Sequence, residues 1–199
     1  MRFAGFLLLT YLIGSVNFAI VVLGLLGKGD PREAFSGNAG TTNVCRQAGK
    51  GWAAVVLILD VGRAAGLASL ALALLPHDLV PWTGLVLGLG NRFPCFHRFK
   101  GGKGVAGYLG FTLPLAPWGT ALSCVVWVVV HRMTRIPFVA SFCMILILGG
   151  ATVVAIGTRM APVAGTVLTV LLIAFNHKGN IVSLAGKWRE SSPVSPGEK

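Results

Sequence analysis

The sequence predicts an all-α polytopic membrane protein with about seven transmembrane helices, some of them short or broken. Of the 199 residues, 54% are hydrophobic and only 12% are charged, and the mean hydropathy is +0.76. A soluble core of this size could not bury so much apolar surface. Backbone amides in lipid need internal partners, and the apolar stretches lack the alternation of barrel strands, so helices are favoured.

The apolar stretches give the expected helices in chain order. The longest reach the ~20 residues that span a bilayer as a helix, whereas the shorter ones predict short or broken helices beside polar segments. The expected helices cover residues 3–26, 52–75, 82–96, 105–115, 117–130, 137–157 and 161–175. We expect one transmembrane domain over residues 1–190, followed by a disordered cytoplasmic tail at 191–199.

Basic residues orient the chain because they gather in alternate connections. The connection between the first two stretches holds Lys28, Arg32, Arg46 and Lys50, whereas residues 76–81 and 112–118 hold neither lysine nor arginine. The positive-inside rule then places the N-terminus outside and the C-terminus in the cytoplasm. The net charge of +11 follows from this asymmetry and from attraction to anionic lipids, so it does not argue for nucleic acid.

Three polar segments rich in glycine and cations interrupt the apolar stretches. We call residues 36–46 the first segment, residues 99–107 the second segment and residues 176–180 the third segment. Each sets cations beside backbone amides that glycine leaves unhindered, at the end of an apolar stretch. A membrane protein can hold phosphate with such an arrangement.

The first segment packs hydroxyls, amides and a guanidinium into one short loop. Its glycines let consecutive N–H groups converge on phosphate oxygens, and Arg46 is placed to add bidentate bonds. The alternative is a polar turn that caps two helices, which serine and asparagine also do. Besides Arg46, the glycine, hydroxyl and amide residues of the first segment are Ser36, Gly37, Asn38, Gly40, Thr41, Thr42 and Asn43.

The second and third segments add further cations and a histidine. Residues 100–104, Lys-Gly-Gly-Lys-Gly, resemble a phosphate nest with Lys103 at its tip, although Gly104 stands where a Walker loop needs Ser or Thr. The alternative is a flexible basic connection. In the third segment, His177 and Asn180 share a face if the last helix continues through them, which suits ligand binding or proton handling. A helix cap is the alternative.

Two charges lie deep in the second apolar stretch. Asp60 and Arg63 are three residues apart, hence on one helix face. Ionisable residues inside a membrane are costly and suggest function. The alternative is an internal ion pair that only orients helices.

The segments resemble two motifs of the acyl-phosphate-dependent glycerol-3-phosphate acyltransferases of bacterial membranes, the PlsY family. The motif SGNxGxTNxxR is met over residues 36–46, and PxFxxFKGGKGxA over residues 94–106. The resemblance implies a seven-helix fold in the bacterial inner membrane with its site on the cytoplasmic side. It also implies transfer of a fatty acyl group from acyl phosphate to the 1-hydroxyl of glycerol 3-phosphate, giving lysophosphatidic acid and phosphate, the first step of phospholipid synthesis.

The resemblance implies that the three segments form one site for two phosphate-bearing substrates. The residues implied to carry the reaction are Ser36, Arg46, Lys103, His177 and Asn180. Those implied to bind substrate phosphate are Asn38, Gly40, Asn43, Arg63, Lys100, Gly101, Gly102 and Gly104. The hydroxyl proton goes either to His177 or to a substrate phosphate oxygen. We expect no metal or cofactor, because the chain has only six acidic residues and Asp60 is the one inside a span.

The chain departs from the family pattern at several positions, among them Ala64 and Gly107, where the family usually has glycine and threonine. Asn91 stands where the family usually has histidine, Arg63 where it has lysine, and the third motif is eroded at Ser183 and around Glu190. These departures leave open a divergent paralogue that acylates another alcohol. A transporter or binding protein for an organic phosphate is the alternative from another class. We expect a monomer in the bilayer that does not bind nucleic acid.

Overall fold

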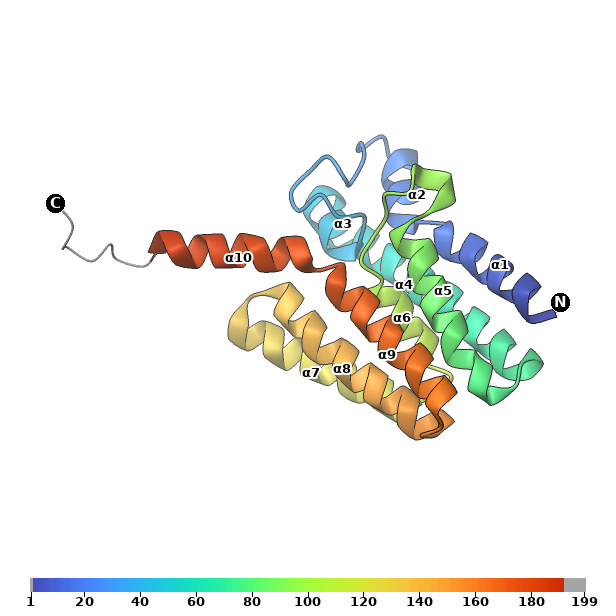
Figure 1. Cartoon of the computed structure of the whole chain (residues 1–199). Helices are drawn as coiled ribbons and strands as arrows, with labels where there is room; N and C mark the ends of the chain where they lie inside the picture. The colour runs from blue at the N-terminus through green and yellow to red at the C-terminus, as the bar shows by residue number, and fades with distance from the viewer. Residues whose placement is uncertain (1, 192–199) are drawn as a thin grey trace.

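The computed structural model describes residues 2–191, which fold into helices with no strand among them (Figure 1). The α-helices are α1 (Arg2–Ser15), α2 (Phe18–Leu25), α3 (Thr41–Ala48), α4 (Lys50–Leu74), α5 (Val80–Arg92), α6 (Val105–Thr112), α7 (Pro117–Thr134), α8 (Pro137–Ile156), α9 (Met160–Phe175) and α10 (Lys178–Ser191). Short 3-10 turns lie at His77–Leu79 and Cys95–His97. Of the tail expected to be disordered, Ser191 ends α10, and residues 192–199 lie outside the described residues.

Each of the seven apolar stretches contains a helix, although α5 ends at Arg92, short of the predicted residue 96, and α6 ends at Thr112, short of the predicted residue 115. Within residues 2–191, three helical units are long and apolar enough to cross a membrane: Phe3–Leu25, Lys50–Leu74 and Pro137–Ile156. A fourth is possible if α9 and the start of α10, bent by 44°, form one broken span. The remaining helices are shorter; the 13 residues of α5 reach only about 20 Å. A total of seven spans and their orientation stay predictions.

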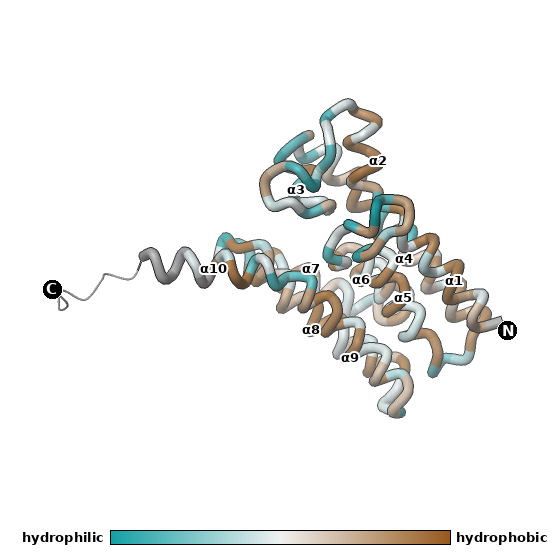
Figure 2. The backbone as a smooth tube through the Cα atoms, turned by 45° about the horizontal axis from the view of Figure 1, so that its top comes forward, coloured by the Kyte–Doolittle hydropathy of each residue, from teal (hydrophilic) through white to brown (hydrophobic). Residues whose placement is uncertain are grey.

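Close backbone contacts pack the helices into one bundle, from which α10 projects (Figure 1). A Cβ added to Gly90 of α5 would lie 2.5 Å from Tyr11 O of α1, and one added to Gly110 of α6 would lie 2.3 Å from Val61 O of α4. Small residues at such crossings let helix backbones approach closely, so that van der Waals contacts can hold apolar helices together in lipid, where the hydrophobic effect does not drive their association. Hydrophilic residues gather at one end of the bundle, around α3 and the loop between α5 and α6 (Figure 2).

The expected first helix is broken in two. α1 ends at Ser15 and α2 begins at Phe18, because Asn17 leaves the helical conformation (φ −94°, ψ 104°) and caps α2. Its Oδ1 accepts from the amide of Ile20 at 3.1 Å. The break frees carbonyls at the end of α1, and in lipid such groups need partners within the protein.

Arg63 of α4 supplies those partners. Its Nη1 donates to the carbonyls of Ile13 at 3.1 Å and Gly14 at 3.3 Å and also to that of Val16, while Nη2 donates to Asp60 Oδ1 at 2.9 Å. The Asp60–Arg63 pair therefore joins α4 to the broken end of α1.

We expect Arg63→Ala to lower the free energy of unfolding by about 3–5 kcal/mol, because it strands the Asp60 charge and the freed carbonyls. The double variant Asp60→Asn/Arg63→Ala should recover only the part due to the stranded charge. Denaturation in detergent measures both. As a control, Arg159→Ala breaks an exposed pair with Asp78, which should contribute about 0–1 kcal/mol. Full recovery in the double variant would show that the carbonyl contacts contribute nothing.

Candidate active site

The three polar segments meet where three helices begin. α3 begins after Gly40 in the first segment, α6 after Gly104 in the second, and α10 after His177 in the third. The first two touch at the backbone, since a Cβ on Gly102 would lie 2.6 Å from Ala39 O. The second and third are joined by Asn176 Nδ2, which donates to Lys103 O at 3.1 Å. Positive helix ends beside a lysine favour a bound anion.

The first segment places its predicted residues in different environments. Gly40 is the extended N-cap of α3, Ser36 is exposed, and Arg46 is exposed in the last turn of that helix. Asn38 is half-buried, with its amide nitrogen 2.8 Å from where a Gly40 Cβ would stand.

Asn43 requires a correction, because its amide nitrogen is not directed at a ligand. The side chain is 1% exposed, and Nδ2 donates to Pro31 O at 2.5 Å and to Ala34 O at 3.0 Å. Asn43 therefore holds the loop before the first segment in place. The residue pattern alone does not distinguish this use of an asparagine from phosphate binding.

The phosphate nest expected at Gly101 and Gly102 also requires a correction. The amide of Gly101 donates to Arg92 O at 3.1 Å, and that of Gly102 donates to Asn91 O at 3.0 Å. These N–H groups are thus used within the protein. Glycine is required there for close approach, because a Cβ on Gly101 would lie 2.0 Å from Asn91 O.

Glycine is required at position 104 for a different reason, namely its backbone conformation. Its φ is +96°, a region that side chains with a Cβ rarely adopt, and it directly precedes α6. The residue lies near Ile173 of α9, with a Cβ position 3.5 Å from Cγ1 of that side chain. Gly104 thus sets the direction of α6 at the point where the segments meet.

Lys103 is a half-buried cation in this cluster. Its Nζ donates to Oδ1 of Asn180, in the first turn of α10. Burial, and to a lesser extent the nearby Arg92 cation, lowers the pKa of Lys103 from 10.5 to about 8. The side chain is therefore largely protonated at neutral pH, and an anion bound beside it would raise the pKa again.

His177 lies in the turn between α9 and α10 and is 2% exposed. The condition for a shared face, that the last apolar helix continues through His177 and Asn180, is not met, because α9 ends at Phe175 and α10 begins at Lys178. Nδ1 of His177 lies 2.8 Å from Ile173 O. Since a carbonyl only accepts, Nδ1 carries the proton in the neutral ring, and Nε2 keeps a lone pair.

Arg63 and Lys100 lie near the cluster without joining it. The guanidinium of Arg63 is engaged as described, and the side chain shares with Asn91 and Gly104 the lining of a cavity of about 10 Å³. The side chain of Lys100 is exposed, while its carbonyl accepts from Arg32. Of the eroded third motif, Ser183 is exposed and bonds Gly179 O within α10. The side chain of Glu190 lies outside the described ones.

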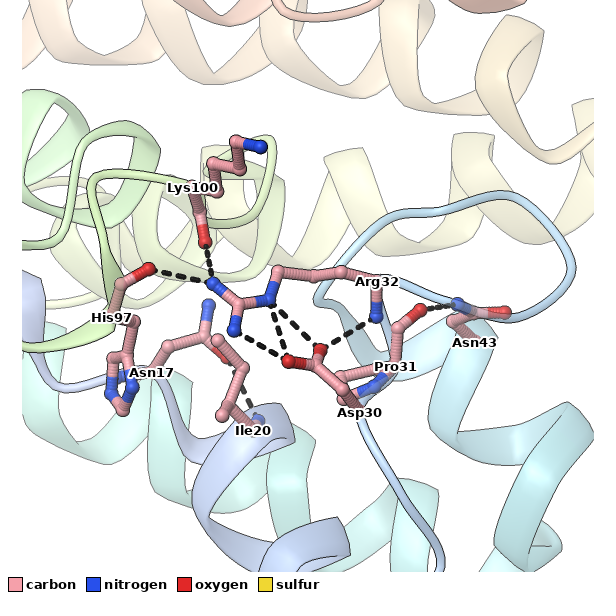
Figure 3. Close-up of polar contacts among 8 residues, drawn as sticks. All are labelled: Asn17, Ile20, Asp30, Pro31, Arg32, Asn43, His97 and Lys100. Atoms are coloured by element: carbon pink, nitrogen blue, oxygen red, sulfur yellow. Dashed lines mark hydrogen bonds and ion pairs between the residues drawn. The ribbon is translucent and has the colours of Figure 1, made fainter.

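Sequence reasoning did not single out several residues that organise the site. Asn176 belongs to the third segment, yet nothing in its position predicts the bond to Lys103 O. Asn17 interrupts an apolar run, and its Nδ2 donates to Ala39 O at 3.2 Å in the first segment. Arg32 bonds the second segment through main-chain carbonyls (Figure 3). Only the polar character of Asn17 within an apolar stretch was a usable signal.

Fold and site together define an integral membrane protein with a cluster of polar segments around Lys103 at one end of its helical bundle. A family model described as glycerol-3-phosphate acyltransferase matches residues 4–187, and the chain belongs to this family. No cluster of three or more metal-ligating side chains occurs among the residues that the structure describes.

Named relatives agree with this assignment. The glycerol-3-phosphate acyltransferase of Jannaschia sp. is 41% identical over 181 residues, covering 89% of this chain and 87% of the relative. That of Pseudomonas syringae is 40% identical over 185 residues, covering 90% and 93%. Two crystal structures of PlsY (YgiH), an integral membrane glycerol 3-phosphate acyltransferase, are each 30% identical and cover 94% of this chain. The match covers 94% of the chain of the glycerol 3-phosphate form, with a TM-score of 0.86. It covers 93% of the chain of the lysophosphatidic acid form, with a TM-score of 0.83.

Substituting the glycines that allow close approach tests the arrangement of the segments. We expect Gly101→Ala to lower acyltransferase activity about a hundredfold, because the added Cβ would displace the loop that carries Lys103 by about 1 Å. Gly107→Ala is the matched control, since a Cβ there meets nothing within 4 Å. Its activity should stay within about twofold of wild type, because the added methyl group displaces nothing and alanine favours the helical conformation of α6 more than glycine does. Equal losses in both variants, measured as initial rates, would contradict the packing argument.

The lowered pKa of Lys103 predicts a pH limb. Since kcat/KM reports the free enzyme, it should fall as pH rises through about 8, where Lys103 loses its charge. In Lys103→Arg this limb should disappear from the range up to about pH 10, because a guanidinium stays protonated there. Initial rates measured from about pH 6 to 10 test this. An alkaline limb that is the same in both proteins would assign it to another group.

Proposed function

We propose that this protein transfers a fatty acyl group from acyl phosphate to the 1-hydroxyl of glycerol 3-phosphate on the cytoplasmic side of the bacterial inner membrane. The observation that carries the proposal is the bond of Lys103, just before α6, to Asn180 in the first turn of α10, beside the contact of Gly102 with Ala39, just before α3. Both substrates bear phosphate, and this is the place in the described chain where cations and positive helix ends come together.

In this reaction the glycerol hydroxyl oxygen attacks the acyl carbonyl carbon. The new ester bond forms as the bond from the acyl carbon to the phosphate oxygen breaks, and inorganic phosphate leaves. The mixed anhydride is already activated, so orientation and electrostatic stabilisation suffice without a covalent enzyme intermediate. Lys103 and Arg46 are assigned to the phosphates, and Ser36, Asn38 and Gly40 to contacts at the start of α3.

The proton of the attacking hydroxyl has two possible acceptors. The Nε2 lone pair of His177 is one, because Nδ1 is held by Ile173 O. A substrate phosphate oxygen is the other. With either acceptor, Asn180 contributes by holding the ammonium of Lys103 through its side-chain carbonyl.

The relatives support the acceptor and the product. One PlsY structure is described as the glycerol 3-phosphate form and another as the lysophosphatidic acid form. These two molecules are the acceptor and the acylated product of the proposed reaction. The acyl-phosphate donor rests on the motif resemblance and on the capacity of the cluster for a second phosphate.

Purified protein assayed with palmitoyl phosphate and glycerol 3-phosphate tests the proposal, with palmitoyl-CoA and palmitoyl-acyl carrier protein as parallel donors. We expect turnover with acyl phosphate and little with the thioesters. Turnover with thioesters alone would overturn the donor assignment. Uptake of glycerol 3-phosphate into liposomes without acyl transfer would favour a transporter.

The same assay tests the assigned cations. Arg46→Ala and Lys103→Ala should each weaken substrate binding about 10- to 100-fold, since a charge-assisted hydrogen bond contributes about 1.5–3 kcal/mol. Arg132→Ala is the matched control, because it removes an exposed cation from the end of α7, which lies outside the three segments. Wild-type kinetics in both site variants would contradict the phosphate assignment.

A further inference from the structure

We propose that Asp30 and Arg32 form a clasp that positions the second segment for substrate binding. Neither side chain is a catalytic residue, because both act through the backbone of another segment. The proposal rests on the proposed function in one respect, namely that the loop carrying Lys103 holds a substrate phosphate.

The guanidinium of Arg32 lies between the carboxylate of Asp30 and the main-chain carbonyls of His97 and Lys100, where the second segment begins (Figure 3). Nη1 donates to His97 O at 2.6 Å and to Lys100 O at 2.9 Å. On its other edge, Nε donates to Asp30 Oδ1 at 2.8 Å, and Nη2 donates to Oδ2 at 2.5 Å. The guanidinium thus joins two connections that are 65 to 68 residues apart in the chain.

The two carbonyls bracket an unfavourable stretch of backbone. Between His97 and Lys100 lie Arg98 and Phe99, both left-handed, with φ of 57° and 54°. Side chains with a Cβ disfavour this region, and such residues persist where surrounding contacts determine the backbone. Nη1 of Arg32 bonds the carbonyl on each side of this pair, so the clasp holds the bend closed.

Asp30 keeps the guanidinium in the orientation that this contact needs. It accepts from Arg32 through both carboxylate oxygens and from the Arg32 backbone amide at 2.8 Å. These bonds lower the pKa of the Asp30 carboxyl, with the Arg32 side-chain hydrogen bond as the largest cause. The carboxylate is therefore ionised at every pH at which the enzyme would be assayed.

The bend leads directly into the site. After Lys100 the chain enters Gly101 and Gly102, whose amides are fixed to α5 carbonyls, and then reaches Lys103. The loop that carries the clasp is also tied to α3, because Asn43 donates to Pro31 O. The clasp thus fixes the first segment and the second segment relative to each other, and its loss should move Lys103 relative to Ser36.

The test compares Arg32→Gln, Arg32→Lys and Asp30→Asn with wild type in detergent. We expect Arg32→Gln to raise the dissociation constant for glycerol 3-phosphate, measured by calorimetry, at least about tenfold, as expected for a lost positioning contact. Trypsin cleavage after Arg98 or Lys100 should accelerate by a similar factor. Arg32→Lys should not restore either value, because one ammonium cannot bond a carboxylate edge and two carbonyls together. Arg132→Gln, an exposed cation on α7, is the control for lost charge.

Selective cleavage at this bend with weaker binding in Arg32→Gln and Asp30→Asn supports the proposal. Wild-type affinity or a wild-type cleavage rate in both variants would overturn it, and so would a uniform rise in cleavage with a lower melting temperature. If Arg32→Gln does not fold, the affinity and the cleavage rate of Asp30→Asn, which keeps the cation, test the proposal alone. Binding and proteolysis need no turnover, so failure of acyl transfer in wild type would reject the proposed function and leave this test intact.

Discussion

The site depends on one backbone contact, the insertion of Gly101 and Gly102 between the end of α5 and the first segment. Their amides donate to the carbonyls of Arg92 and Asn91, and Gly102 lies against Ala39 O. No residue larger than glycine fits, because a Cβ would lie within 2.0 to 2.6 Å of carbonyl oxygens. Since Lys103 follows at once, this contact decides where the cation stands, and the start of α6 follows from it.

A second constraint comes from the bilayer, which provides no water for broken helix ends. The break at Asn17 lets the chain turn toward the first segment, where Asn17 also bonds Ala39 O. The carbonyls freed at the end of α1 are then bonded by Arg63, whose charge is balanced by Asp60. The intramembrane ion pair therefore has an architectural role, and that role serves the site by allowing the break.

Hydropathy predicted where the apolar helices lie, because lipid exposure selects long apolar runs. It missed α3, whose residues are mostly polar, and the break at Asn17, which local hydropathy averages out. The three segments were predicted to belong together, and they meet. The use of Gly101 and Gly102 was mistaken, since glycine permits both a phosphate nest and close backbone approach. The contact of Arg32 with the carbonyl of His97 spans 65 residues and leaves no local pattern in the sequence.

The electrostatics of the cluster explain why a phosphate ester suits it better than a neutral alcohol. Burial, and to a lesser extent the nearby Arg92 cation, lowers the pKa of Lys103 to about 8, so the charged ammonium is held at a cost. The N-termini of the helices that begin in the three segments add partial positive charge nearby. A bound phosphate reverses that penalty and restores the full charge of the lysine. Both substrates and both products of acyl transfer carry phosphate, so binding alone gives no direction to the reaction. In the proposed reaction the direction comes from the acyl phosphate, whose anhydride bond is exchanged for a more stable ester, and the assigned role of the cluster is to hold the two phosphates in position for attack.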